Sequence, residues 1–237
     1  MDAWLSADPG SRTRTDSNRW GVSPTVRSGY DFVMKAGHLG ASARARVSAT
    51  EAATDHHWHV QHEDHVALIR DGVAGAGSRW LELGAGDGEF TLALADLLGD
   101  AGRIIAVDRD RWALAELERR VSVRFPGTHL RTTIADFTSE LGGTDLDGIL
   151  AANSLHFVPD LAPVLSAIRE ALVPGGRLVL VEYDATDGNP YVPHPIAFAR
   201  WQAIAPAAGF TVPRLLHRVP SRFLGSIYAA ACERPAR

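Results

Sequence analysis

The chain of 237 residues is 46% hydrophobic and 22% charged, so it can bury one sizeable core, and its single cysteine, Cys232, excludes an intrachain disulfide. The formal net charge of -4 at pH 7 gives no electrostatic reason to expect a nucleic acid or an anionic membrane surface as a partner. The N-terminus lacks an apolar stretch of signal-peptide length, and no run approaches the roughly 20 apolar residues that cross a bilayer. We therefore expect a cytoplasmic protein whose partner is a small molecule, with no membrane and no nucleic acid.

The first part of the chain divides into two segments before the pattern of a sheet begins. Residues 1–28 mix Ser, Thr, Arg, Asp, Pro and Gly without periodicity, which is typical of a flexible arm. Residues 29–76 favour a helical extension, in which residues 54–73 form the best helix, capped by Thr54 or Asp55. One face of this helix carries Trp58, His62, His65 and Ile69. We expect that face to lie against the following domain.

Five histidines fall within this extension: His56, His57, His59, His62 and His65. Imidazoles three or four residues apart share a helix face, which is an arrangement that metal sites can use. The chain lacks the H-E-x-x-H spacing, however, because "HEDH" places the second histidine one residue early. We therefore predict no metal site and interpret the cluster as structural or solvent-facing.

Residues 77–237 alternate short apolar runs, turns and amphipathic runs, which is typical of strands and helices around a parallel sheet. The predicted strands are residues 79–83, 103–108, 129–136, 147–153 and 175–184. The predicted helices are residues 89–99, 110–123, 161–173 and 194–209, with "PGG" at 174–176 ending the third. Two more strands, 210–219 and 222–232, would pair antiparallel at one edge, because only a tight turn separates them. The sequence therefore predicts an α/β fold with a doubly wound, mostly parallel sheet.

The stretch "WLELGAGDGEF" indicates a binding loop for a nucleotide-like cofactor. Gly84, Gly86 and Gly88 follow a strand and precede a helix, so the backbone amides there are open to close approach. A dinucleotide favours the spacing G-x-G-x-x-G, whereas the spacing here is G-x-G-x-G. The carboxylates of Glu82 and Asp87 are unfavourable beside a pyrophosphate, but they suit an ammonium or a sulfonium. The pattern therefore favours S-adenosylmethionine over a dinucleotide.

Two further acidic residues end the next two strands. Asp108 follows "RIIAV" at the position where an acidic side chain accepts hydrogen bonds from both ribose hydroxyls. Asp136 follows "RTTIA" and could accept from an adenine amino group, while Phe137 or Arg109 covers a face of the ring. Because ligands of open α/β sheets bind at the carboxyl ends of the strands, we expect these residues to surround one ligand.

Five segments of the chain resemble the ordered motifs of the class I S-adenosylmethionine-dependent methyltransferases. They are "LELGAGDG", "AVDRD", "IADF", "DGILAANSLHFVPD" and "LVPGGRLVLVEYD". The resemblance covers residues 79–184 and implies a Rossmann-like, seven-stranded sheet whose last strand is antiparallel. It also implies that Glu82 supports the glycine loop and the methionine amino group, and that Asn153 lies beside the methionine portion. The predicted cofactor-binding residues are Glu82, Gly84, Gly86, Gly88, Asp108, Arg109, Asp136, Phe137 and Asn153.

The resemblance also bears on the histidine-rich segment before the glycine loop. Small-molecule methyltransferases of this class use such segments as a lid. The resemblance therefore makes four residues candidates for closing over the cofactor: His62, Glu63, Asp64 and His65.

His156 follows the fourth predicted strand and so faces the same edge of the sheet. It is our candidate catalytic residue, as a general base, because imidazole exchanges protons readily near neutral pH. The alternative is that His156 caps or packs the loop that follows it. Four residues could line an acceptor pocket: Tyr183, Asp184, Tyr191 and His194.

The leading hypothesis is methyl transfer from S-adenosylmethionine to an oxygen, nitrogen or carbon nucleophile of a small organic molecule. Because the sulfonium already activates the methyl group, the protein mainly aligns the reactants and excludes water, so the sequence does not choose among the three atoms. Three alternatives stay open: a non-methylating reaction that uses the bound cofactor, an NAD-dependent oxidoreductase, and a binding protein with an inactive site. The oligomeric state is also open, with a homodimer as one arrangement.

Overall fold

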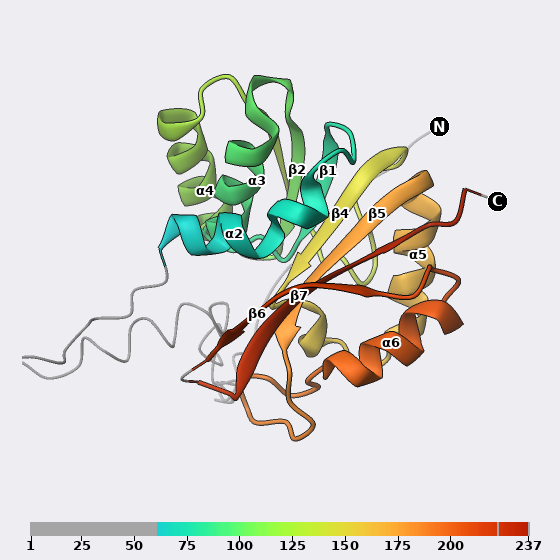
Figure 1. The fold of residues 1–237 in the computed structure, drawn as a ribbon. Coiled ribbons are helices and arrows are strands. Elements are labelled where there is room, and N and C mark those ends of the chain that lie inside the picture. The colour runs from blue at the N-terminus through green and yellow to red at the C-terminus, as the bar shows by residue number, and fades with distance from the viewer. Residues whose placement is uncertain (1–60, 222, 237) are drawn as a thin grey trace, which may run out of the picture.

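A seven-stranded mixed sheet forms the centre of the computed structural model, which describes residues 61–221 and 223–236 (Figure 1). The strands lie in the order β3-β2-β1-β4-β5-β7-β6. Their bounds are Arg79–Leu83 (β1), Arg103–Asp108 (β2), His129–Ile134 (β3), Leu146–Ala152 (β4), Leu172–Tyr183 (β5), Arg214–Pro220 (β6) and Ser226–Glu233 (β7). β1 to β5 pair in parallel, and β7 is antiparallel to both of its neighbours. The predicted fold, with its antiparallel C-terminal strand, is confirmed.

Helices cover both faces of this sheet (Figure 1). The α-helices are His62–Val73 (α2), Glu89–Leu98 (α3), Arg111–Arg124 (α4), Ala162–Ala171 (α5) and Phe198–Ala207 (α6). Two short 3-10 helices, Gly99–Ala101 (η2) and Leu155–Phe157 (η3), lie in connections. Within the described part of the chain, no helix has the length and apolarity to span a membrane.

The core has two sides because successive residues of a strand point to opposite faces. On one face, Ile69 of α2 and Leu94 of α3 pack with Ile104 of β2 in one apolar cluster. On the other face, Leu81 of β1 belongs to a cluster that includes Leu165 of α5. Strands buried on both faces read as nearly continuous apolar runs, which is why β1 and β4 were recognisable from the sequence.

Several predicted element boundaries are wrong. α6, β6 and β7 each begin four residues after the predicted start, at Phe198, Arg214 and Ser226. The helix predicted over residues 54–73 begins at His62, where Asp64 accepts a hydrogen bond from the Gln61 amide at 2.8 Å. The "PGG" segment does not end a helix but lies inside β5, which begins at Leu172. The segment interrupts the pairing with β4: Gly175 has a φ of 79°, the register shifts between Leu172 and Arg177, and the Gly175 amide donates to the Arg234 carbonyl at 2.8 Å. The predicted arm, residues 1–28, lies outside the described residues.

Candidate cofactor and active site

The glycine loop joins β1 to α3 at the carboxyl edge of the sheet. Gly84, Gly86 and Gly88 have φ angles of 74°, 54° and 94°, a region that favours glycine. A Cβ on Gly84 would lie 2.7 Å from Ser154 Cβ, and a Cβ on Gly88 would lie 2.7 Å from Leu117 Cγ. The first and third of these glycines are therefore required by close packing as well as by backbone conformation.

Gly88→Ala is expected to lower the free energy of unfolding by about 2–4 kcal/mol, since the methyl group adds overpacking against Leu117 to backbone strain. Gly99→Ala is the matched control, because Gly99 has a φ of 60° but nothing within 4 Å of its Cβ position. That control should lose only about 1 kcal/mol. Urea unfolding of both variants measures the difference. Equal losses of unfolding free energy would show that Leu117 can move to accommodate the added methyl group.

Asp108, at the end of β2, is bound to the glycine loop. Its Oδ2 accepts a hydrogen bond from the Gly86 amide at 2.8 Å, and its Oδ1 accepts from the Asp110 amide at 2.8 Å. A carboxylate offers about four lone-pair sites, so each oxygen keeps capacity for a second donor. Asp108 therefore orients the loop and can still accept from a pair of hydroxyls.

Glu82 is buried beneath the loop, in the fourth position of β1. Its Oε2 accepts a hydrogen bond from the Thr91 hydroxyl of α3. Burial raises the pKa of the Glu82 carboxyl from 4.5 to about 8, and the nearby charge of Asp108 adds to this rise. Glu82 is thus largely protonated at neutral pH, and an ammonium group placed beside it would favour its ionised form.

A pocket opens between the glycine loop, the first turn of α3 and the end of β4. It is lined by Glu82, Gly84, Ala85, Gly86, Asp87, Glu89, Phe90, Ala152 and Asn153. Four of the predicted cofactor residues therefore share one pocket, namely Glu82, Gly84, Gly86 and Asn153. The sequence reasoning overlooked Glu89 and Phe90, although their place in the first turn after a glycine loop was a usable signal. Asn153 has a φ of 51°, and its buried Oδ1 has no hydrogen-bond partner among the residues described.

Arg120 of α4 fixes the outer side of this pocket. Its Nη1 donates to the Asp87 carbonyl at 2.8 Å, and its Nη2 lies 2.9 Å from Glu89 Oε1. One guanidinium therefore connects the glycine loop with the helix that follows it. No sequence signal in the loop itself pointed to this residue, since 33 positions separate Arg120 from Asp87.

The end of β3 carries the predicted adenine contacts. Arg109 Nη1 lies 3.8 Å from Asp136 Oδ2, so the two side chains face each other. Asp136 Oδ1 accepts from the Thr138 hydroxyl at 2.6 Å and from its amide at 2.9 Å, which lowers the pKa of Asp136. Phe137 Cε1 lies 3.7 Å from the Cβ position of Gly84. Phe137 therefore lies beside the glycine loop, and none of these three residues lines its pocket.

His156 and Glu182 form a buried pair at the same edge, with exposed fractions of 2% and 0%. His156 Nδ1 lies 2.7 Å from Glu182 Oε2, and the His156 amide donates to Glu182 Oε1 at 3.1 Å. His156 Nε2 is buried and has no hydrogen-bond partner within the described ranges. The Glu182 carboxyl therefore orients the imidazole through Nδ1.

The comparisons with known proteins agree with this geometry. Residues 81–178 match the family model of a methyltransferase domain. This part of the chain is therefore a methyltransferase domain, built on a seven-stranded sheet with the order β3-β2-β1-β4-β5-β7-β6.

Among the relatives of this methyltransferase domain, a non-reducing polyketide synthase from Aspergillus terreus is 34% identical over 131 residues. That match covers 51% of this chain but only 5% of the synthase, so the chain spans a small part of its curated relative.

Two solved structures share the fold. Phosphoethanolamine N-methyltransferase 2 from Haemonchus contortus, solved with phosphomonomethylethanolamine and S-adenosylhomocysteine, aligns with a TM-score of 0.61 and 15% identity over 73% of this chain and 52% of that one. Magnesium protoporphyrin IX methyltransferase from Synechocystis, with bound S-adenosylmethionine, aligns with a TM-score of 0.57 and 18% identity over 73% of this chain and 77% of that one.

Two of the four residues that could line an acceptor pocket, Tyr183 and His194, lie near His156. Its ring centroid is 6.2 Å from that of Tyr183, which in turn lies 5.7 Å from Phe223. Tyr191 lies 5.9 Å from Phe223 on another side. Asp184 is engaged elsewhere, since its Oδ1 accepts from the Phe198 amide at 2.9 Å and its Oδ2 lies 2.7 Å from a guanidinium nitrogen of Arg218. The side chain of His194 is exposed.

The described histidines of the N-terminal cluster pack against α3. His62 Nε2 lies 2.8 Å from Asp96, and the ring of His65 is buried 4.7 Å from the ring of Phe90. Burial lowers the pKa of His65. In the part of the chain that the structure describes, no group of three or more His, Cys, Asp or Glu could hold a metal ion. His56, His57 and His59 lie outside the described residues.

Proposed function

We propose that the chain transfers the methyl group of S-adenosylmethionine to an oxygen, nitrogen or carbon nucleophile of a small organic molecule, with His156 as the base. The observation that carries the proposal is the buried pair of His156 and Glu182, which lies at the same edge of the sheet as the glycine-loop pocket. A small-molecule acceptor is supported by the two structural relatives, whose names specify phosphoethanolamine and magnesium protoporphyrin IX. We also propose a cytoplasmic location and no nucleic-acid partner, in keeping with the net charge of -4.

The residues around the glycine loop suit this cofactor. Asp108 would accept from the ribose hydroxyls, and Glu82 would face the ammonium of the methionine portion. The buried Oδ1 of Asn153 would accept from the same portion, which would satisfy an atom that lacks a partner in the described structure. Asp136 and Phe137 would hold the adenine. The bound cofactor supplies an activated methyl group, so the chain's own task is to bind, orient and exclude water.

The proton would leave the acceptor through His156. With the carboxylate of Glu182 beside Nδ1, the Nδ1–H tautomer is favoured, and Nε2 is then the basic nitrogen. Glu182 also stabilises the imidazolium that forms when Nε2 takes a proton. Glu182 is thus a positioning residue that acts through His156.

Asp108→Ala is expected to weaken the binding of S-adenosylmethionine by about 1–3 kcal/mol, through the loss of hydrogen bonds to the ribose. Asp110→Ala is the matched control, since it removes a neighbouring carboxylate that caps α4 through the Trp112 amide. The control should affect stability more than affinity. Isothermal titration calorimetry of both variants measures the difference, and unchanged affinity in Asp108→Ala would reject the ribose assignment.

The function itself is tested by titrating the protein with S-adenosylmethionine, S-adenosylhomocysteine and NAD, followed by a screen of small acceptors for release of S-adenosylhomocysteine. Binding of the first two ligands and not NAD, with acceptor-dependent release, is the expected result. Binding of NAD alone would overturn the proposal. Cofactor binding with a modified acceptor but no S-adenosylhomocysteine would show a non-methylating reaction.

A further inference from the structure

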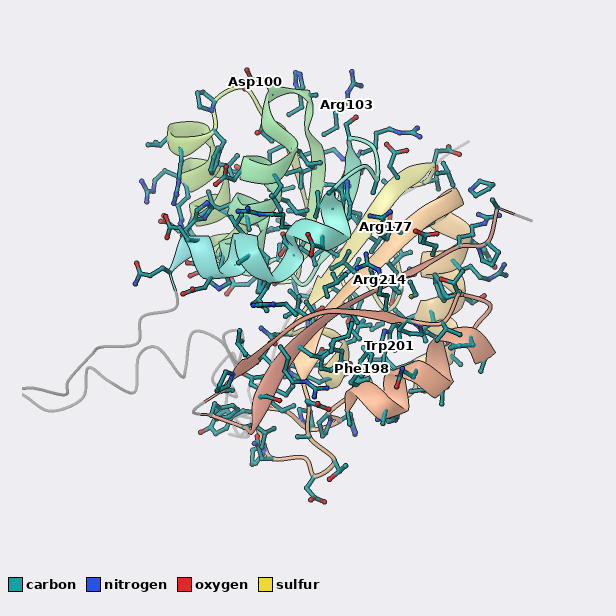
Figure 2. All side chains as sticks on the ribbon, in the orientation of Figure 1. Asp100, Arg103, Arg177, Phe198, Trp201 and Arg214 are labelled. Carbon is teal, nitrogen blue, oxygen red and sulfur yellow. The ribbon has the colours of Figure 1, made fainter. Side chains whose placement is uncertain are left out.

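A second cavity lies at the opposite edge of the sheet from the cofactor, at the amino ends of β1, β2 and β3. Its volume is about 490 Å³, within the range of small-molecule sites. Arg103 begins β2 and Asp108 ends it, so the cavity lies roughly 17 Å from the cofactor edge at about 3.3 Å per residue. Figure 2 shows Arg103 at the outer end of β2, on the side of the molecule away from Trp201. The cavity is therefore separate from the proposed active site.

The cavity exists because the connection from β3 to β4 contains no helix. In its place a loop of residues 135–145 covers the carboxyl half of the sheet face. There the Cβ position of Gly142 lies 3.5 Å from Val107, and that of Gly143 lies 2.8 Å from Ile105. The amino half of the same face is left open, and Ile105 and Leu146 form part of the cavity lining.

Cationic side chains surround this opening. Arg79, Arg103 and His129 are register partners on three neighbouring strands, and Arg131 is paired with Ile105. Side chains at alternate positions share a face, so Arg103, Ile105, His129 and Arg131 point toward the same side of the sheet. The three arginines and the histidine, Arg79, Arg103, Arg131 and His129, all line the cavity.

The charges around the opening are only partly neutralised. Arg79 pairs with Asp147 at 3.1 Å. Across the described ranges, no carboxylate lies within 4.0 Å of the guanidinium of Arg103 or Arg131, and Arg131 donates to the carbonyl of Gly142. The whole chain has a net charge of -4, so this local excess of positive charge does not follow from composition. Paired guanidinium groups are suited to bidentate recognition of phosphate or carboxylate.

We propose that this cavity binds a small organic anion, whose phosphate or carboxylate is held by Arg103 and Arg131 and whose apolar body contacts Ile105 and Leu146. The charged rim sets the sign of the ligand, and the aliphatic lining adds affinity for an attached hydrocarbon. Because neither the methyl donor nor its acceptor takes part, the site does not depend on the proposed methyl transfer.

Calorimetric titration with phenyl phosphate, inorganic phosphate and benzyl alcohol tests the site. Phenyl phosphate should bind saturably, inorganic phosphate at least threefold more weakly, and benzyl alcohol not measurably. The double variant Arg103→Gln and Arg131→Gln should bind phenyl phosphate at least tenfold more weakly. Arg70→Gln, which removes an exposed arginine of α2 outside the cavity, is the matched control and should bind as the wild type does.

Three results would overturn the assignment: no binding of phenyl phosphate, equal binding by the double variant, or loss of binding in Asp108→Ala, which would place the ligand at the cofactor edge. Equal affinities for phenyl phosphate and inorganic phosphate would reject the contribution of the apolar lining. If the double variant does not fold by circular dichroism, Arg103→Gln alone provides the test, since Arg103 is exposed.

Discussion

Replacing His156 with alanine is expected to lower kcat for methyl transfer by about 10²–10⁴-fold, the range that a positioned general base contributes. The affinity for S-adenosylmethionine should change little, because His156 does not line the glycine-loop pocket. Single-turnover measurement of S-adenosylhomocysteine formation, with the acceptor found in the screen, separates the chemical step from binding. An unaltered rate and pH profile would reject the base.

Glu182→Gln distinguishes a base held by a carboxylate from a histidine that merely packs. The glutamine keeps the size of the side chain and can still accept from Nδ1–H, but it lacks the charge that stabilises an imidazolium. We expect kcat to fall, KM to stay nearly constant and the pH profile to change. For the variant His156→Ala, the control is His217→Ala, which removes an exposed imidazole on β6.

If Glu182→Gln unfolds the protein, the pH profile of kcat for His156→Ala provides the test instead. A histidine that only packs would leave the shape of this profile the same as in the wild type. If both variants keep the wild-type profile and rate, the pair is structural. The acceptor would then have to be a nucleophile that is already deprotonated or neutral.

The sequence allowed the glycine loop and the strand ends to be predicted because their signals are local. Three glycines at alternate positions and an acidic residue after an apolar run lie within about 25 residues of chain. The structure brings these features into contact, as the hydrogen bond from the Gly86 amide to Asp108 shows. The order of the strands then places Asn153 in the same pocket.

The partners that sequence reasoning overlooked depend on contacts between distant segments. Glu182 was included in a predicted strand, but its pairing with His156 requires β4 and β5 to be neighbours in parallel register. A carboxylate within a buried apolar strand was the signal that could have revealed it. The misassigned "PGG" segment has the same cause, because its place within β5 depends on hydrogen bonding with Arg234, about 60 residues later.

Glu82 affects both stability and cofactor binding. We expect Glu82→Gln to stabilise the fold and to weaken the binding of S-adenosylmethionine. Burial raises the pKa of this carboxyl to about 8, whereas in the unfolded chain it titrates near 4.5. The unfolded state therefore loses its proton first as pH rises, and the native protein loses stability between about pH 4.5 and pH 8. Glutamine has no proton to lose, so the variant should gain on the order of a few kcal/mol over the wild type across that window.

Urea unfolding of Glu82→Gln and the wild type at pH 5, 7 and 9 measures this gain, with the exposed Glu140→Gln as the control. A stability difference that is the same at all three pH values would contradict the raised pKa.

The same substitution should weaken cofactor binding, although it stabilises the fold. The ammonium of S-adenosylmethionine favours ionised Glu82, so binding should release a proton near pH 7, which calorimetry in buffers of different ionisation enthalpy detects. The variant Glu82→Gln has no proton to release at this position. Its affinity for S-adenosylmethionine should fall at least tenfold, since a charge-assisted interaction of about 1.5–3 kcal/mol is lost.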